Sequence, residues 1–244
     1  MHHYDDPHYN YQAYWKNRDY EHQSEVLAIN YLLSGKYFKK IADVGGGFGR
    51  HFPTLSPFSQ EVYLIEPSAK LRQIAKKTYI HDQKLHVIHG FSHHLPIKPE
   101  TFDLVSMIRV SHHLTQLAPT FKEINRVLKP RGHLLLEFAN SANFKTQLYH
   151  LFSDIPQIPI EKRSLTNIHK QTIAFVNHHP RTILKLLDQS GFIIENTLSV
   201  SNFRSPILKK LIPQIILLFL ETISQRLLAP VFFGPSILVL AKKA

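Results

Sequence analysis

From Lys39 onward, the chain alternates short apolar runs with amphipathic segments. The apolar runs are rich in β-branched and aliphatic residues, and they predict strands over 40–44, 61–66, 85–90, 102–108 and 132–139. Helical spacing predicts one helix over 68–79, with Ser68 as its N-cap, and another over 121–130 that Pro130 stops. This alternation is typical of an α/β fold with a parallel sheet and helices on both faces.

The later part of the chain continues the pattern less regularly. It predicts a helix that Gly191 ends, a strand over 192–200 and a last strand over 235–243. Two segments stand outside the alternation. The sequence therefore predicts a single domain over 1–244, with an N-terminal helical arm or cap over 1–37 and an apolar helical insert over 203–233, between the last two strands.

The apolar insert raises the question of a membrane. Its densest apolar run, Ile215 to Leu220, is far shorter than the ~20 residues that span a bilayer. Four interpretations stay open: a buried or lid helix, the wall of an apolar substrate pocket, a dimer contact, and peripheral membrane contact through 207–220. The sequence does not indicate the oligomeric state.

The composition adds charge and excludes some chemistry. There are 29 Lys and Arg against 18 Asp and Glu, a formal charge of +11, and the basic residues are scattered as pairs. Such an excess suits nucleic acid, an anionic membrane surface or an acidic substrate. The absence of cysteine excludes disulfides and thiolate metal sites. The start is polar and aromatic without the apolar core of a signal peptide, so we expect a cytoplasmic protein.

The stretch "KIADVGGGFGRHF", residues 40–52, carries a glycine-rich turn directly after the first predicted strand. Such a turn exposes backbone N–H groups and often binds an anion. A phosphate loop needs Lys and then Ser or Thr after its last glycine, but here Arg50 and His51 follow Gly49. The dinucleotide fingerprint needs a glycine where Arg50 stands, which disfavours a nicotinamide-dependent oxidoreductase. What remains is Gly45-x-Gly47-x-Gly49, preceded by an acidic residue.

With that loop, the sequence resembles the class I S-adenosylmethionine-dependent methyltransferases, in the type 11 methyltransferase domain group. The resemblance rests on "ADVGGGFG", on the acidic end of "VYLIE", on "HGFSHHLPIKPETFDLVSMIRVSHHL", on "EINRVLKPRGHLLLE" and on "LLDQSGF", all in the family's order. It covers about 43–200 and the last strand. It implies a Rossmann-like, doubly wound, seven-stranded sheet, mostly parallel with an antiparallel C-terminal strand pair.

The resemblance also implies S-adenosyl-L-methionine as the cofactor. Glu66 falls where the family holds the ribose hydroxyls, and a carboxylate accepting both would fix orientation. Phe91 stands where many members carry an acidic residue for the adenine amino group, so we expect adenine on apolar surface with a hydrogen bond from Ser92. The expected cofactor-binding residues are Asp43, Gly45, Gly46, Gly47, Gly49, Glu66, Pro67, Phe91, Ser92 and Arg109.

Methyl transfer from a sulfonium needs alignment above all, and a base only where the acceptor loses a proton. His112 and His113 follow the fourth predicted strand and are the candidate catalytic residues; Glu137 and Asn140 follow the fifth. The arm interleaves aromatic and basic residues, and we expect Tyr14, Trp15 and Arg18 to approach the site as cap residues. The histidine pairs lack the spacing of a zinc helix, so no metal is expected.

Three functional hypotheses follow. The first is methyl transfer by in-line displacement to a small-molecule acceptor, of lipophilic or aromatic character. The second, suggested by the +11 charge, makes RNA the acceptor, although no appended RNA-binding module accompanies the domain. The third is a cofactor-binding protein that has lost catalysis.

Overall fold

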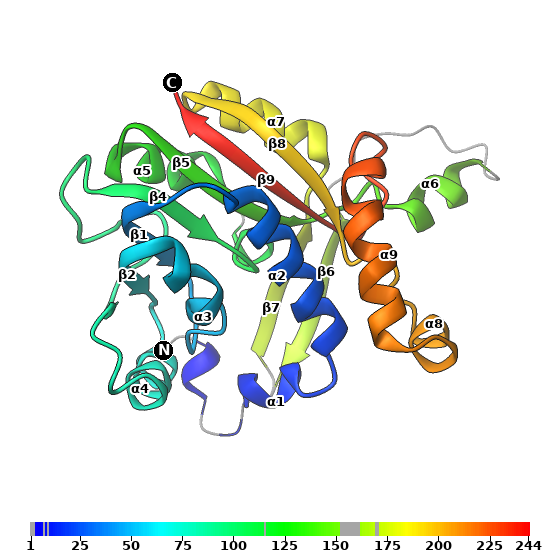
Figure 1. Cartoon of the computed structure of the whole chain (residues 1–244), viewed down its shortest axis with the longest axis horizontal. Coiled ribbons are helices and arrows are strands. Elements are labelled where there is room, and N and C mark those ends of the chain that lie inside the picture. The colour runs from blue at the N-terminus through cyan, green and yellow to red at the C-terminus, as the bar shows by residue number, and fades with distance from the viewer. Residues whose placement is uncertain (1–2, 7, 9, 115, 152–161, 169–170) are drawn as a thin grey trace.

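A computed structural model describes residues 3–6, 8, 10–114, 116–151, 162–168 and 171–244. A seven-stranded sheet, in the order β3-β2-β1-β4-β5-β9-β8, forms its centre (Figure 1). Its strands are β1 (Phe38–Val44), β2 (Ser59–Ile65), β3 (Leu85–Ile88), β4 (Phe102–Met107), β5 (Leu128–Ala139), β8 (Phe192–Val200) and β9 (Ser236–Lys243). β1 to β5 run parallel, and β9 is antiparallel to both β5 and β8. The predicted Rossmann-like fold class is confirmed.

Helices cover both faces of this sheet. α5 (Ala118–Val127) and α7 (Pro180–Gln189) bury their apolar side chains with one set of strand residues. α2 (Asp19–Leu33) and α3 (Phe52–Leu55) pack against the strand side chains that point the other way, such as Ile41 and Leu104. Alternate residues of a strand face opposite sides, so the near-continuous apolar runs of the central strands supply both layers.

The remaining helices lie at the ends and edges of the sheet. α1 (Tyr11–Trp15) precedes α2, α4 (Ala69–Thr78) follows β2, and α6 (Phe144–Leu151) follows β5. Ser68 caps α4 as predicted, accepting a hydrogen bond from the amide of Leu71. α8 (Pro206–Leu211) and α9 (Gln214–Leu227) occupy the insert between β8 and β9, and α9 packs beside α2 (Figure 1).

Two expectations about elements were wrong. Pro130 does not end the helix before it: α5 ends at Val127, and Pro130 lies inside β5. The proline is exposed, and the pairing of β5 with β9 begins only at His133. The missing N–H of Pro130 therefore removes no hydrogen bond between β5 and β9. The sequence analysis also placed no element over 141–179, where β6 (Lys162–Ile168) and β7 (Gln171–Asn177) form a separate antiparallel pair.

Candidate functional site

The glycine loop, residues 45–49, follows β1 and lies pressed against neighbouring side chains. Gly45 has φ +71°, and a Cβ built there would come within 2.3 Å of a Val110 methyl group. A Cβ on Gly46 would come within 2.5 Å of the Asp43 carboxylate, which is buried beneath the loop. No side chain therefore fits at either position.

Gly47 is different because a Cβ would fit there without a collision. Its φ is +60°, and a Cβ there would meet nothing closer than Tyr11 Cε1 at 3.7 Å. Gly47 borders a small pocket at the carboxyl ends of β1 and β4, where open α/β sheets bind their ligands. The described residues that line this pocket are Tyr11, Asp43, Gly45, Gly46, Gly47, Phe48, Arg50, His51, Ile108 and Arg109.

Glu66 follows β2 beside this glycine. Its buried carboxylate accepts hydrogen bonds from the Gly47 amide at 3.0 Å and from the Ser68 amide at 2.9 Å. Burial raises the pKa of Glu66 to about 7, although the two amides oppose the rise. Burial likewise raises the pKa of Asp43 to about 6. An acidic group next to bare backbone fits a ligand that offers hydroxyl donors, as the ribose of the expected cofactor does.

A buried carboxylate on α2 holds the glycine loop from the other side. Glu25 accepts hydrogen bonds from Arg109 Nε at 2.6 Å, from Arg50 Nη1 at 2.7 Å and from His51 Nε2 at 3.1 Å. Burial alone would raise the pKa of Glu25, but Arg109 and Arg50 together hold it well below its usual range. The ion pairs therefore fix α2, the loop and the end of β4 relative to one another.

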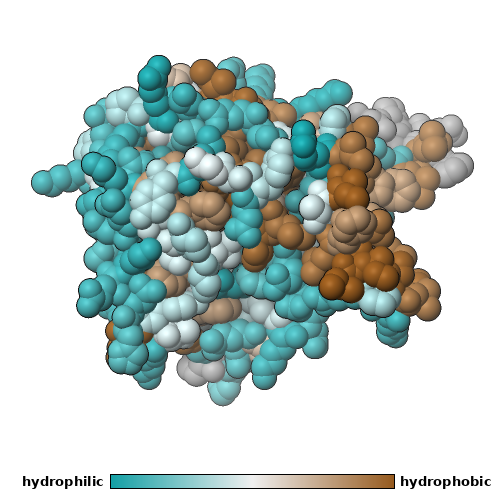
Figure 2. Space-filling view, in the orientation of Figure 1, coloured by the Kyte–Doolittle hydropathy of each residue, from teal (hydrophilic) through white to brown (hydrophobic). Residues whose placement is uncertain are grey.

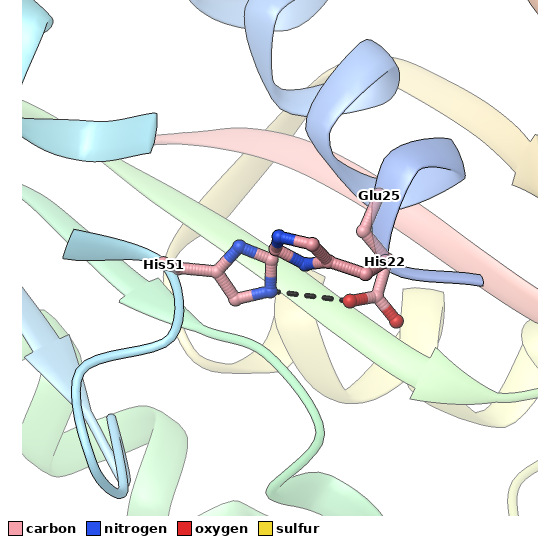
Figure 3. A group of neighbouring side chains, drawn as sticks. All are labelled: His22, Glu25 and His51. Carbon is pink, nitrogen blue, oxygen red and sulfur yellow. Dashed lines mark hydrogen bonds and ion pairs between the residues drawn. The ribbon is translucent and has the colours of Figure 1, made fainter. Parts of the chain in front are cut away.

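His22, Glu25 and His51 approach each other closely enough to suggest a metal site (Figure 3), their ligand atoms lying within 4.8 Å of one another. However, Arg50 Nη1 lies 2.7 Å from both His22 Nδ1 and Glu25 Oε2. With a second cation, Arg109, on the same carboxylate, a metal ion would meet repulsion rather than a vacant anionic site. We assign this cluster to positioning the loop.

The N-terminal arm crosses the pocket. The Trp15 ring lies under the Arg50 guanidinium, 3.6 Å from ring centroid to Cζ, so this predicted cap residue contacts the site's cations. Tyr14 and Arg18 pair with each other, 4.0 Å from ring centroid to Cζ, and Tyr14 is 43% exposed. Tyr11, which lines the pocket, is the arm residue that the sequence analysis did not single out.

Further towards the N-terminus, the turn His3–Asp5 bridges two strand ends. Tyr4 Oη lies 2.9 Å from His113 Nε2, and Asp5 Oδ1 accepts a hydrogen bond from Ser68 Oγ at 2.6 Å. Ser68 follows β2, and His113 follows β4. The arm is thus attached on both sides of the carboxyl edge of the sheet.

The candidate catalytic histidines occupy the turn Ser111–His113, after β4. His112 is buried, with its ring 4.4 Å from that of Phe175, and its Nδ1 has no hydrogen-bond partner among the described residues. Burial, and then the neighbouring His113 and Arg109, lower the pKa of His112 well below its usual range. The imidazole is therefore neutral at physiological pH. His178 Nε2 lies 3.0 Å from the Ser111 carbonyl oxygen and helps to hold the turn.

Three other candidate residues take supporting positions. Arg109 has φ +62°, and its amide donates a hydrogen bond to Glu137 Oε2 at 3.0 Å. Its guanidinium points to Glu25 on α2, and the residue also lines the pocket. The second oxygen of Glu137 is buried and has no partner among the described residues. Asn140 Nδ2 donates to the carbonyl oxygens of Phe232 and Gly234, both at 2.7 Å, which anchors the chain before β9.

The residues expected around adenine lie outside the described pocket lining. Phe91 is 42% exposed in the turn after β3, and its ring contacts those of His89 and His93. Ser92 follows it, half-buried. Pro67 lies next to Glu66, and its carbonyl oxygen accepts a hydrogen bond from Arg72 Nη1 at 2.7 Å. The structure brings Asp43, the glycines, Glu66 and Arg109 together, whereas Phe91 and Ser92 follow β3 and are not among the residues that line the described pocket.

Comparison with known proteins supports this assignment of the fold. A family model described as a methyltransferase domain matches residues 42–136. A solved S-adenosylmethionine-dependent methyltransferase from Mesorhizobium loti superposes with a TM-score of 0.61 and 16% identity, covering 90% of this chain and 98% of the other.

Two curated relatives are similar in sequence. Ubiquinone biosynthesis O-methyltransferase of Aliivibrio fischeri (strain MJ11) is 24% identical over 175 residues, which is 70% of this chain and 72% of that protein. Ubiquinone/menaquinone biosynthesis C-methyltransferase UbiE of Rubrivivax gelatinosus is 28% identical over 116 residues, 46% of this chain and 45% of the other.

Proposed function

We propose, on the premise that the chain belongs to the class I S-adenosylmethionine-dependent methyltransferases, that it methylates a small lipophilic or aromatic acceptor. S-adenosylmethionine, its cofactor, supplies a methyl group on a positively charged sulfur. We assign Glu66 to the ribose hydroxyls and the backbone of Gly47 to close contact with the cofactor, because this carboxylate accepts a hydrogen bond from a glycine that lines the pocket.

The observation that carries the acceptor class is the aromatic surround of the pocket. Tyr11 and Phe48 both line the pocket, with their ring centroids 5.8 Å apart, and Tyr4 lies behind Tyr11 at 4.9 Å between ring centroids. Aromatic side chains at a pocket favour a ring-shaped acceptor. The two relatives named for ubiquinone and menaquinone biosynthesis support the same class.

His112 is the group we assign to proton transfer. A neutral imidazole with an unpartnered Nδ1 can accept a proton from an acceptor hydroxyl as that oxygen is methylated. His112 Nδ1 would take the hydroxyl proton. The bound cofactor would supply the methyl carbon, whose bond to sulfur breaks as the oxygen lone pair bonds to it, with neutral S-adenosylhomocysteine as the leaving group.

Two titrations and one transfer assay test this function. S-adenosylhomocysteine and NAD are titrated calorimetrically into the full chain; preferential binding of NAD contradicts the family-based function. Radiolabelled methyl transfer is then measured with a catechol that carries a prenyl chain, with the same catechol lacking the chain, and with RNA. We expect the prenylated catechol to be the best acceptor. Labelling of RNA alone would support the RNA hypothesis, and cofactor binding without transfer would support the inactive-protein hypothesis.

A further inference from the structure

The insert presents a regular apolar stripe to solvent. The stripe repeats every four residues along α8 and α9, and its members are 49–78% exposed: Ile207, Leu211, Ile215, Phe219, Ile223 and Leu227. Residues four apart lie on one face of a helix, so Ile207 and Leu211 share a face of α8, and the other four share a face of α9. Figure 2 shows these helices as a continuous apolar projection at one side of the molecule. We call this surface the insert stripe.

The opposite face of α9 is buried and mostly polar. Leu217, Glu221, Ser224 and Gln225 are its buried residues. Glu221 Oε2 accepts a hydrogen bond from Tyr20 Oη at 2.6 Å, and Gln225 Nε2 donates to the Ser24 carbonyl oxygen at 2.8 Å. The inward set is offset from the stripe by two residues, about 200° around the helix. α9 therefore turns its polar side to the protein and its apolar side to water, the reverse of a water-facing helix.

The charges around the stripe have one sign. Residues 203–233 contain four basic residues and a single acidic one, Glu221. Glu221 is fully buried, so the exposed charges of the insert are all positive. Lys210 and Arg226 lie exposed beside the stripe, whereas Lys209 Nζ is paired with Glu21 at 2.9 Å. An apolar face flanked by basic residues is complementary to an anionic lipid surface.

We infer that the insert stripe docks on an anionic lipid bilayer, lying in the interface with α8 and α9 rather than crossing it. In the described part of the chain, no helix is long and apolar enough to cross a membrane, which agrees with surface docking. A second copy of the chain is a poorer occupant, because a twofold contact would bring like charges beside the stripe together. Polar bonds of α9 to α2 hold the stripe outward without lipid. The inference does not depend on the acceptor.

Vesicle binding by the full chain tests the docking. Flotation with phosphatidylcholine vesicles is compared with flotation on vesicles that also contain phosphatidylglycerol; we expect binding to the anionic vesicles only. The double variant Ile215→Ser/Phe219→Ser should reduce the partition coefficient at least about tenfold, because two apolar side chains no longer leave water. The matched control is Ile80→Ser, since Ile80 is 71% exposed but lies after α4, and its partition should be unchanged.

Two charge-reversal variants distinguish local contact of the stripe with lipid from attraction by the overall +11 charge. Lys210→Glu should weaken binding to anionic vesicles about tenfold. Lys76→Glu makes the same charge change on α4, away from the stripe, and should change binding much less. Equal losses in the two variants would show that overall charge, not the stripe, drives binding, and would overturn the inference.

A spectroscopic test keeps the stripe almost intact. The chain has no cysteine, so Phe219→Cys and Ile80→Cys each accept one environment-sensitive dye. A blue shift on anionic vesicles at 219 but not at 80 supports insertion of the stripe. The inference is overturned if the dye shows no shift at either position. It is also overturned if the protein binds no vesicles and instead sediments as a dimer that the Ile215→Ser/Phe219→Ser variant dissociates. S-adenosylhomocysteine affinity and thermal melting of each variant verify that the fold is unchanged.

Discussion

Arg109 Nε donates a hydrogen bond to Glu25 Oε1 over 2.6 Å, which joins the end of β4 to α2 across 84 residues of sequence. The same carboxylate also accepts a hydrogen bond from Arg50, the residue directly after the glycine loop. One buried acidic group therefore fixes the positions of α2, the residue after the glycine loop and the end of β4 relative to one another.

Glu25→Gln should destabilise the protein by about 3–5 kcal/mol, because it leaves two buried arginines without their counter-charge. Denaturant unfolding measures the loss. Glu61→Gln is the matched control: Glu61 pairs with Lys40 at 3.7 Å in a partly exposed position, so its loss should cost under about 1 kcal/mol. Equal effects of the two substitutions would contradict a structural role for the buried cluster.

Gly45→Ala and Gly47→Ala should separate folding from cofactor binding. At position 45 the new methyl group collides with Val110, so the thermal midpoint should fall markedly. At position 47 the new methyl group collides with no neighbour, and only the left-handed backbone resists, at about 1–2 kcal/mol. Gly47→Ala should nevertheless bind S-adenosylhomocysteine at least about tenfold more weakly, by calorimetry. Unchanged affinity would show that the cofactor does not approach this residue.

Affinity for S-adenosylhomocysteine should rise with pH until Glu66 is ionised. The folded pKa of Glu66, raised by burial to about 7, means that much of the carboxyl is protonated below neutrality. Ribose hydroxyls donate to the ionised form, so binding should strengthen as pH rises through about 7 and then level off. Calorimetry between about pH 6 and pH 8 measures this, and Glu66→Gln should bind weakly at every pH. A wild-type affinity independent of pH would contradict the ribose assignment.

The raised pKa of Glu66 also makes the stability of the ligand-free protein depend on pH. Because the folded pKa of Glu66 lies above its unfolded value, the folded state binds more protons between those two values. The contribution of Glu66 to stability is therefore fully present at acidic pH and is lost as pH rises through about 7. Glu66→Gln should flatten that part of the unfolding profile. A steeper profile in the variant would refute the sign of the effect.

His112→Asn should lower kcat about 10²–10⁴-fold with an acceptor that loses a proton, while S-adenosylhomocysteine affinity stays the same. His81→Asn, at an exposed position after α4, is the control and should leave kcat unchanged. If His112→Asn retains full kcat across the pH range, the proton-transfer role is excluded.

Removing residues 1–15 should accelerate dissociation of S-adenosylhomocysteine, because Tyr11 no longer lines the pocket and Trp15 no longer packs on Arg50. Stopped-flow displacement measures the rate. Tyr4→Phe deletes only the hydroxyl that meets His113 and should have a smaller effect. An unchanged rate in the truncated chain would show that the arm does not enclose the cofactor.

Much of the central sheet could be predicted because each buried strand reveals itself by its own apolar run, and the loop by its glycines. Glu25 could not be found this way. Its burial depends on Arg50 and Arg109, which are distant in sequence, and an acidic residue in a helix normally faces solvent. The orientation of α9 could not be predicted either. A periodic pattern shows that a helix has an apolar side, but the hydrogen-bond partners of Glu221 and Gln225 on α2 decide which side is buried.

The position of β9 has a consequence for biosynthesis. β9 is the last strand in chain order, yet it pairs with β5 on one side and β8 on the other. While the ribosome still holds residues 236–243, both neighbours present unsatisfied backbone edges, which favour wrong pairing between chains. The sheet can therefore close only after residues 236–243 have left the ribosome, and until then the edges of β5 and β8 stay open to pairing with other chains.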